Sequence, residues 1–205
     1  MHQKDLDCRG LPCPQPVVQC KHSIDQDKPD EISILVDNEA ARQNVTRFLK
    51  SQGYHVDDQK EAESTWLIKG SFEEGSLITR DAEQTEATSQ PATEIRTLVF
   101  LSAPGIGEGD PALGEKLMVN FLATLPEMGS QLWRMILVNG AVQLAAKDHP
   151  CLESLQKLEA LGVSILVCGT CLTHFGLMEK KAVGQTTNML DVVTSLQMAG
   201  KVIRP

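Results

Sequence analysis

A cysteine flanked by two prolines stands near the start of the chain, within residues 7–16, DCRGLPCPQP. Proline is favoured in the first turn of a helix, because the N–H that it lacks has no intrahelical partner there. Pro14 and Pro16 therefore predict a helix that places Cys13 at its N-cap. A sulfur at that position is close to the positive end of the helix dipole and to the Gln15 N–H, which favours the thiolate. The pattern predicts a cysteine that accepts or donates sulfur; the alternative is a small buried residue beside a helix start.

The second pair of cysteines forms the run Cys168-Gly169-Thr170-Cys171, directly after the predicted apolar strand Val163–Val167. Cys168 and Cys171 are close enough in sequence to share one site. A zinc site would need four ligands, and this pair with His174 supplies three at most. A thioredoxin-type redox pair would follow a different element of the fold.

A sulfur-accepting thiol, with the other cysteine as the resolving thiol, fits a position at the end of a strand. The structural alternative is that Cys168 and Cys171 are two half-buried residues at a turn made by Gly169. Both interpretations remain open from the residues alone.

Residues 6–18, LDCRGLPCPQPVV, resemble the signature of the TusA/SirA-like sulfur-carrier family, and the resemblance covers about residues 4–70. It includes the pair Arg9-Gly10 and the Cys-Pro-x-Pro helix start. The resemblance implies that Cys13 carries a persulfide. Arg9 is then either an electrostatic helper or part of a structural salt bridge. Cys8 replaces the commoner apolar residue of this family, and is either a second carrier or resolving thiol or a plain strand residue.

Residues 96–205 resemble the DsrE/F-like superfamily, and the order of the two parts resembles the YedF family, which is linked to selenium metabolism. The matching segments are 109–114 (GDPALG), 139–142 (NGAV), 168–172 (CGTCL) and 183–189 (VGQTTNM). The resemblance implies that Cys168 is the active cysteine ahead of Cys171. It also implies a homo-oligomer formed through this part of the chain.

The periodicity predicts two α/β domains. Residues 1–72 alternate as β-α-β-α-β-β, which predicts a two-layer sandwich with two helices on one face of a four-stranded sheet. Residues 73–95 are acidic, with no large apolar residue in their central part, and predict a flexible linker. The segment 96–205 alternates apolar strands with amphipathic helices, which predicts a mostly parallel sheet in a three-layer domain.

The carboxyl ends of parallel strands are where such sheets bind ligands. In the second domain the loops at these ends are expected to begin at Ser102, Asn139 and Cys168. The sequence thus directs attention to one edge of the predicted sheet.

The composition limits the classes of function. Of 205 residues 41% are hydrophobic and 22% charged, as in an ordinary globular protein. The net charge of −8 argues against nucleic acid as a partner. No apolar run is long enough for a bilayer and no signal peptide is evident, so we expect a cytoplasmic protein whose six cysteines are reduced. We expect no cofactor and no bound metal.

The function predicted from these features is a carrier or transferase of sulfur, with selenium as the other possible cargo. A cysteine desulfurase would load Cys13, and the sulfur would pass to Cys168 or to a downstream acceptor protein. The alternative is a non-enzymatic adaptor whose cysteines respond to redox state or selenium.

Overall fold

The computed structural model describes residues 2–72 and 95–205. The chain divides into two compact units, Met1–Pro91 and Ala92–Pro205. The predicted linker at 73–95 falls almost wholly outside the described residues, so the predicted domain boundaries remain predictions. Within the described ranges no helix is both long and apolar enough to cross a membrane.

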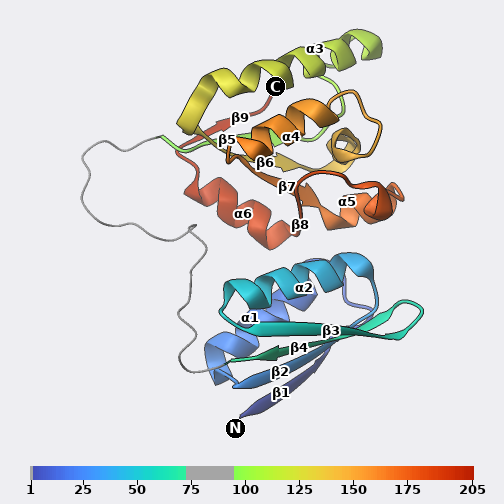
Figure 1. The fold of residues 1–205 in the computed structure, drawn as a ribbon, viewed down its shortest axis with the longest axis vertical. Coiled ribbons are helices and arrows are strands. Elements are labelled where there is room, and N and C mark those ends of the chain that lie inside the picture. Colours follow the sequence, from blue (N-terminus) through green and yellow to red (C-terminus); the bar gives the residue numbers. More distant parts are fainter. Residues whose placement is uncertain (1, 73–94) are drawn as a thin grey trace. The chain divides into compact units, whose positions relative to one another are not determined.

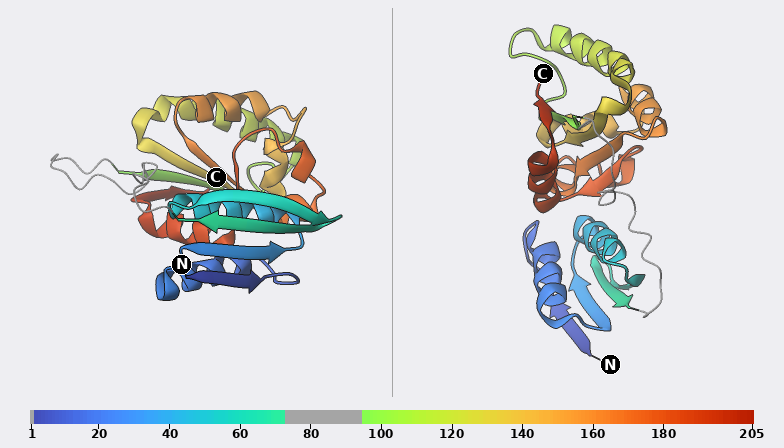
Figure 2. Two further views of the ribbon diagram at one scale, coloured as in Figure 1. Left: turned by 60° about the horizontal axis from the view of Figure 1, so that its bottom comes forward. Right: turned by 90° about the vertical axis from the view of Figure 1, so that its left-hand side faces the viewer.

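The N-terminal unit contains four strands and two helices in the described residues, and it confirms the predicted β-α-β-α-β-β order (Figure 1). Its elements are β1 (Gln3–Asp7), α1 (Gln15–Asp27), β2 (Glu31–Val36), α2 (Glu39–Ser51), β3 (His55–Ala62) and β4 (Thr65–Ser71). The strand order is β1-β2-β4-β3, with β1 parallel to β2 and β4 antiparallel to both of its neighbours. Both helices lie along one face of this sheet, which makes the two-layer sandwich (Figures 1 and 2).

Alternation along the strands explains why one face of this sheet is covered. In β2 every second residue is buried, beginning with Ile32. The helices supply the opposite side of the core, including Val17 from α1 and Leu49 from α2. The start of α2 is fixed by its N-cap Asn38, whose side chain accepts a hydrogen bond from the Ala41 N–H at 2.8 Å.

The C-terminal unit contains a five-stranded sheet in which every pairing is parallel. Its elements are β5 (Thr97–Leu101), α3 (Pro111–Thr124), η1 (Leu125–Gln131), β6 (Leu132–Leu137), η2 (Asn139–Ala145), α4 (Leu152–Ala160), β7 (Ser164–Cys168), α5 (Gly169–His174), η3 (Met178–Lys180), β8 (Gln185–Thr187), α6 (Met189–Met198) and β9 (Lys201–Ile203). The strand order is β8-β7-β6-β5-β9.

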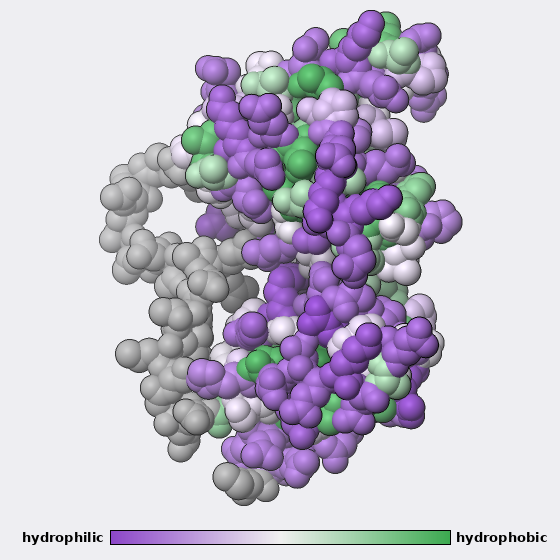
Figure 3. Space-filling model, turned by 45° about the vertical axis from the view of Figure 1, so that its right-hand side comes forward, coloured by the Kyte–Doolittle hydropathy of each residue, from purple (hydrophilic) through white to green (hydrophobic). Residues whose placement is uncertain are grey.

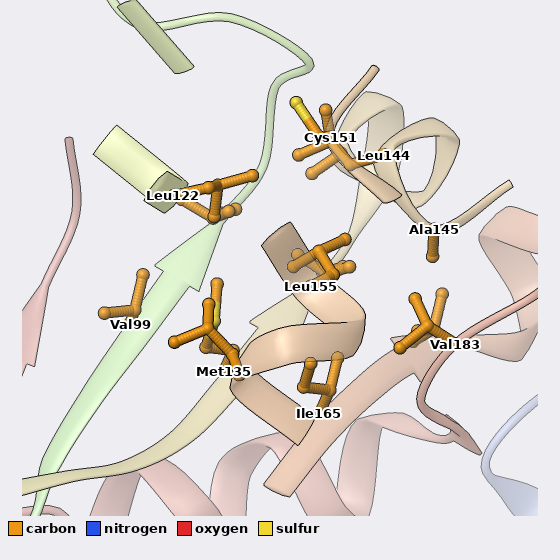
Figure 4. Packing of buried hydrophobic residues seen from close by; sticks show 14 of the residues in the cluster. Val99, Leu122, Met135, Leu144, Ala145, Cys151, Leu155, Ile165 and Val183 are labelled. Carbon is orange, nitrogen blue, oxygen red and sulfur yellow. The ribbon is translucent and has the colours of Figure 1, made fainter. Parts of the chain in front are cut away.

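Helices cover both faces of this sheet, so the predicted three-layer arrangement is confirmed. The larger core joins α3, α4 and α5 to one face, and Figure 4 shows part of it around Met135, Leu155 and Ile165. Cys151 lies inside this cluster and is 1% exposed, so its thiol is part of the core. The other face is covered by α6, whose Val192 is part of a smaller cluster.

The cysteine sites lie at definite edges of the two sheets. In the N-terminal unit the loop that carries Cys13 follows the carboxyl end of β1, whereas the chain leaves this unit at the opposite edge, where the Phe72 N–H donates to the Asp30 carbonyl. In the C-terminal unit the chain enters at the amino end of β5, and Cys168 ends β7 at the carboxyl edge.

On the face drawn in Figure 3 the surface is mostly hydrophilic, with scattered apolar patches.

Candidate functional site

Cys13 lies in the loop between β1 and α1 and is exposed. The predicted cap position was wrong by one residue: the helix begins at Gln15 and its N-cap is Pro14. The Gln15 N–H, which we expected near the sulfur, instead donates to the Pro12 carbonyl at 2.8 Å. Pro16 is buried in the first turn, so the loop enters a fixed helix start. The sulfur is therefore presented outward just before the helix.

Gly10 and Asp37 hold this loop against the end of β2. The Gly10 N–H donates to the Asp37 carboxylate at 2.6 Å, and the Cys8 N–H donates to the Leu35 carbonyl at 2.8 Å. Gly10 has a φ of +70°, which suits glycine. This hydrogen bond between the loop and Asp37 was not predicted from the sequence.

Arg9 forms a salt bridge, which was one of the two roles left open for it. Its Nε and Nη2 donate to the two carboxylate oxygens of Asp7 at 2.9 Å and 2.6 Å. The hydrogen bonds from Arg9 lower the pKa of Asp7 from 3.8 to about 2. Because both side chains are exposed, the pair shapes the charge beside the loop more than it stabilises the fold.

Cys8 is buried directly after β1, with 1% of its surface exposed. Burial, with a smaller effect of the Asp7 charge, raises the pKa of its thiol to about 11. Its Sγ lies 3.8 Å from Oε1 of Gln19 in α1. Burial also raises the pKa of the Cys20 thiol, and the Cys8 charge adds to that shift. These features favour a structural role for Cys8 over a second carrier thiol.

The pKa of Cys8 leads to a test by alkylation. At pH 8 a thiol with a pKa of about 11 is ionised in roughly one molecule in a thousand, and the thiolate is the reactive form. We expect iodoacetamide to modify Cys8 at least about 100-fold more slowly than exposed Cys13 in the folded protein. The Cys8 rate should rise about tenfold per pH unit up to about pH 11. Equal modification of both cysteines at pH 8 would contradict this role.

The second cysteine site lies at the carboxyl edge of the parallel sheet. Cys168 is the last residue of β7, pairs in register with Thr187 of β8, and is 4% exposed. Gly169 begins α5 and is buried, and Thr170 is exposed. The site is therefore formed by the end of the sheet itself, and Cys168 is buried there.

Cys171 is the more accessible cysteine of the pair. It is half-buried in α5, and its Sγ accepts a hydrogen bond from the Asn139 N–H at 3.1 Å. Asn139 lies two residues after the end of β6 and has a φ of +48°, a conformation that asparagine adopts more readily than most residues. The next residue, Gly140, leaves no room for a Cβ beside Pro104, at 2.9 Å from its Cδ. The Asn139 N–H that donates to Cys171 thus belongs to a closely packed backbone segment.

The topology places the cysteine pair at the edge of the sheet where ligands bind in open α/β folds. The chain leaves β7 toward α5 on one face of the sheet and leaves β8 toward α6 on the other. In open α/β sheets, ligands bind outside the carboxyl ends of the strands. Cys168 ends one of these strands, which places the cysteine pair beside that position.

The chemistry available at both sites is that of thiols. All six cysteines lie in the described ranges, and none forms a disulfide. Among residues 2–72 and 95–205 there is no group of three His, Cys, Asp or Glu side chains that could hold a metal ion. His174, considered from the sequence as a third zinc ligand with the pair, instead lies edge-on to Phe175.

The class of protein follows from comparison of the N-terminal unit with known sequences. The family model described as "Sulfurtransferase TusA" matches residues 4–70, the part of the chain that contains the β1–α1 loop and Cys13. A proposed sulfur carrier protein of Methanocaldococcus jannaschii is 33% identical over 66 residues, which cover 32% of this chain and 88% of the relative.

This chain belongs to the TusA sulfurtransferase family through its N-terminal unit. Among solved structures, a SirA-like protein from Desulfitobacterium hafniense is 23% identical with a TM-score of 0.31, covering 33% of this chain and 95% of its own. The ychN protein from E. coli is 18% identical with a TM-score of 0.43, covering 54% of this chain and 99% of its own.

Proposed function

We propose that this protein carries sulfur as a persulfide on Cys13 and relays it to the cysteine pair that follows β7. The observation that carries the proposal is the exposure of Cys13. It is the one exposed cysteine among the six, all of which lie in the described ranges, and it stands in the part of the chain that matches the family model. A carrier must bring its sulfur to proteins of different shape, which an outward thiol in an anchored loop allows.

The source and the destination of the sulfur follow from this role. A cysteine desulfurase is the proposed donor, because it forms a persulfide that an exposed thiolate can attack. The resemblance of residues 96–205 to DsrE/F-like proteins supports the second unit as an acceptor, with Cys168 as the residue that the resemblance favours. A downstream acceptor protein would take the sulfur next. Selenium is part of the proposal because both chalcogens use the same thiolate chemistry.

The experiment loads the purified, reduced full chain with a cysteine desulfurase and cysteine, and maps added sulfur by peptide mass spectrometry. We expect one added sulfur on Cys13, and a reaction without cysteine is the control. An unmodified Cys13 beside an active desulfurase would overturn the proposal and favour a protein-binding adaptor. Repeating the reaction with selenocysteine and a lyase that acts on it shows whether selenium is also accepted.

A further inference from the structure

We propose that Cys171 is the thiol that receives sulfur in the C-terminal unit, and that Cys168 is the resolving thiol that releases it. This order rests on the proposed sulfur-relay function and reverses the one that the DsrE/F resemblance implies. It is carried by the different surroundings of the two sulfur atoms.

Access separates the two cysteines. Transfer requires a thiolate to attack the outer sulfur of an incoming persulfide, so the attacking atom must be reachable by a second protein. Cys168 is 4% exposed at the end of β7, behind the surface of the sheet. Cys171 lies one helical turn later and is only half-buried. A protein-bound persulfide can approach Cys171 without opening the strand end.

The backbone of Asn139 prepares Cys171 for this step. Its N–H donates to Sγ of Cys171 at 3.1 Å, from a segment fixed by the end of β6 and by the packing of Gly140 against Pro104. A hydrogen bond donated to sulfur stabilises negative charge on it. The same N–H can hold the sulfur in one orientation while the terminal sulfur atom is transferred.

The first step moves a sulfur atom without net oxidation. The Cys171 thiolate attacks the terminal sulfur of the donor persulfide, and a new S–S bond forms at Cys171. The S–S bond of the donor breaks, and the donor leaves as a thiolate with the electron pair of that bond. Cys171 then carries the persulfide.

The second step uses the spacing of the pair. Residues three apart at a helix start lie about 5–6 Å from each other, within reach of a disulfide after a small adjustment. The Cys168 thiolate attacks Sγ of Cys171 and forms a Cys168–Cys171 disulfide. The bond from Sγ to the terminal sulfur breaks, and that sulfur leaves as hydrosulfide with the electron pair. The two thiols are oxidised, the sulfane sulfur is reduced to sulfide, and a dithiol reductant restores the pair.

The test uses inorganic polysulfide as the donor and the full chain with Cys13→Ser, so that loading of the pair does not depend on Cys13. After brief exposure and alkylation, fragment spectra assign the added sulfur to one cysteine. In the Cys13→Ser protein we expect the added sulfur on Cys171. A protein that also carries Cys171→Ser should show no loading of the pair. A protein that instead also carries Cys168→Ser should hold at least about fivefold more Cys171 persulfide and release less sulfide. Sulfur on Cys168 in the Cys171→Ser protein at the unsubstituted level would overturn the order.

A second measurement needs no substitution and is independent of folding defects in the variants. Iodoacetamide should modify Cys171 of the native chain at least about tenfold faster than Cys168, with buried Cys151 as an internal reference. Equal rates for Cys168 and Cys171 would also overturn the order. Failure of a desulfurase to load Cys13 would contradict the proposed relay function. The polysulfide reaction would still show which cysteine of the pair accepts sulfur.

Discussion

Replacing Cys13 by serine is expected to lower the transfer of labelled sulfur from cysteine to an acceptor by at least about 100-fold. A hydroxyl has nearly the shape of a thiol but cannot hold a sulfane sulfur, so the substitution removes the chemistry and leaves the loop. The loop should stay in place because Asp37 still accepts the Gly10 N–H and Pro16 remains buried. The measurement is the amount of labelled sulfur that the acceptor gains in the presence of a cysteine desulfurase.

The matched control is Cys8→Ala in the same loop. Cys8 is buried and the pKa of its thiol is about 11, so we expect its loss to change the transfer rate by no more than about twofold. A Cys13→Ser protein that transfers sulfur at the unsubstituted rate would contradict the carrier function. If Cys8→Ala instead abolished transfer, Cys8 would have to be a second carrier thiol.

Substitution at Gly184 should strongly destabilise the C-terminal unit. A Cβ there would lie 2.9 Å from the carbonyl oxygen and from Cγ2 of Ile165, and the residue has a φ of +75°. The backbone conformation costs an alanine about 1–2 kcal/mol, and the crowding in the core adds about 1–3 kcal/mol. We expect Gly184→Ala to lower the free energy of unfolding by about 2–5 kcal/mol.

Gly176 offers a control that separates these two causes. It has a φ of +64°, but a Cβ there would meet nothing within 4 Å. Gly176→Ala should therefore cost only the backbone part, about 1–2 kcal/mol. Each unit holds one tryptophan, Trp66 and Trp133, so urea unfolding followed by Trp133 fluorescence in a Trp66→Phe background reports on the C-terminal unit. Equal effects of the two substitutions would show that the contact with Ile165 is not a close one.

Much of the fold could be predicted because it depends on local patterns. The sequence predicts a strand at the apolar run Thr97–Leu101, which coincides with β5, and a helix at Pro111–Leu125, which differs from α3 by one residue. The strand is a continuous apolar run, the helix is an amphipathic segment, and both have clear boundaries. In contrast, β8 and β9 were not predicted. Each has three residues, too few to show a period, and each forms an edge of the sheet that depends on pairing with the neighbouring strand.

The candidate sites were predicted as residues but not as arrangements. The rule that ligands bind at the carboxyl ends of parallel strands directed attention to the loops at Asn139 and Cys168. It could not show that the Asn139 N–H meets Cys171, because that contact joins residues 32 positions apart and depends on the packing of two loops. The cap position of Cys13 failed for a similar reason, since the Pro12 carbonyl competes for the Gln15 N–H.

Each unit is attached to the rest of the chain by the edge opposite its cysteines, and this has a consequence for reach. A strand of five to seven residues spans roughly 17–23 Å. If the two cysteine edges of one chain are to face each other, the chain between Phe72 and Ile95 has to pass along both units, roughly 40 Å in total. The number of residues in that stretch therefore limits the distance that it can span. In the proposed relay, a stretch too short for that span would direct sulfur from Cys13 to a neighbouring chain and not to the cysteine pair of its own.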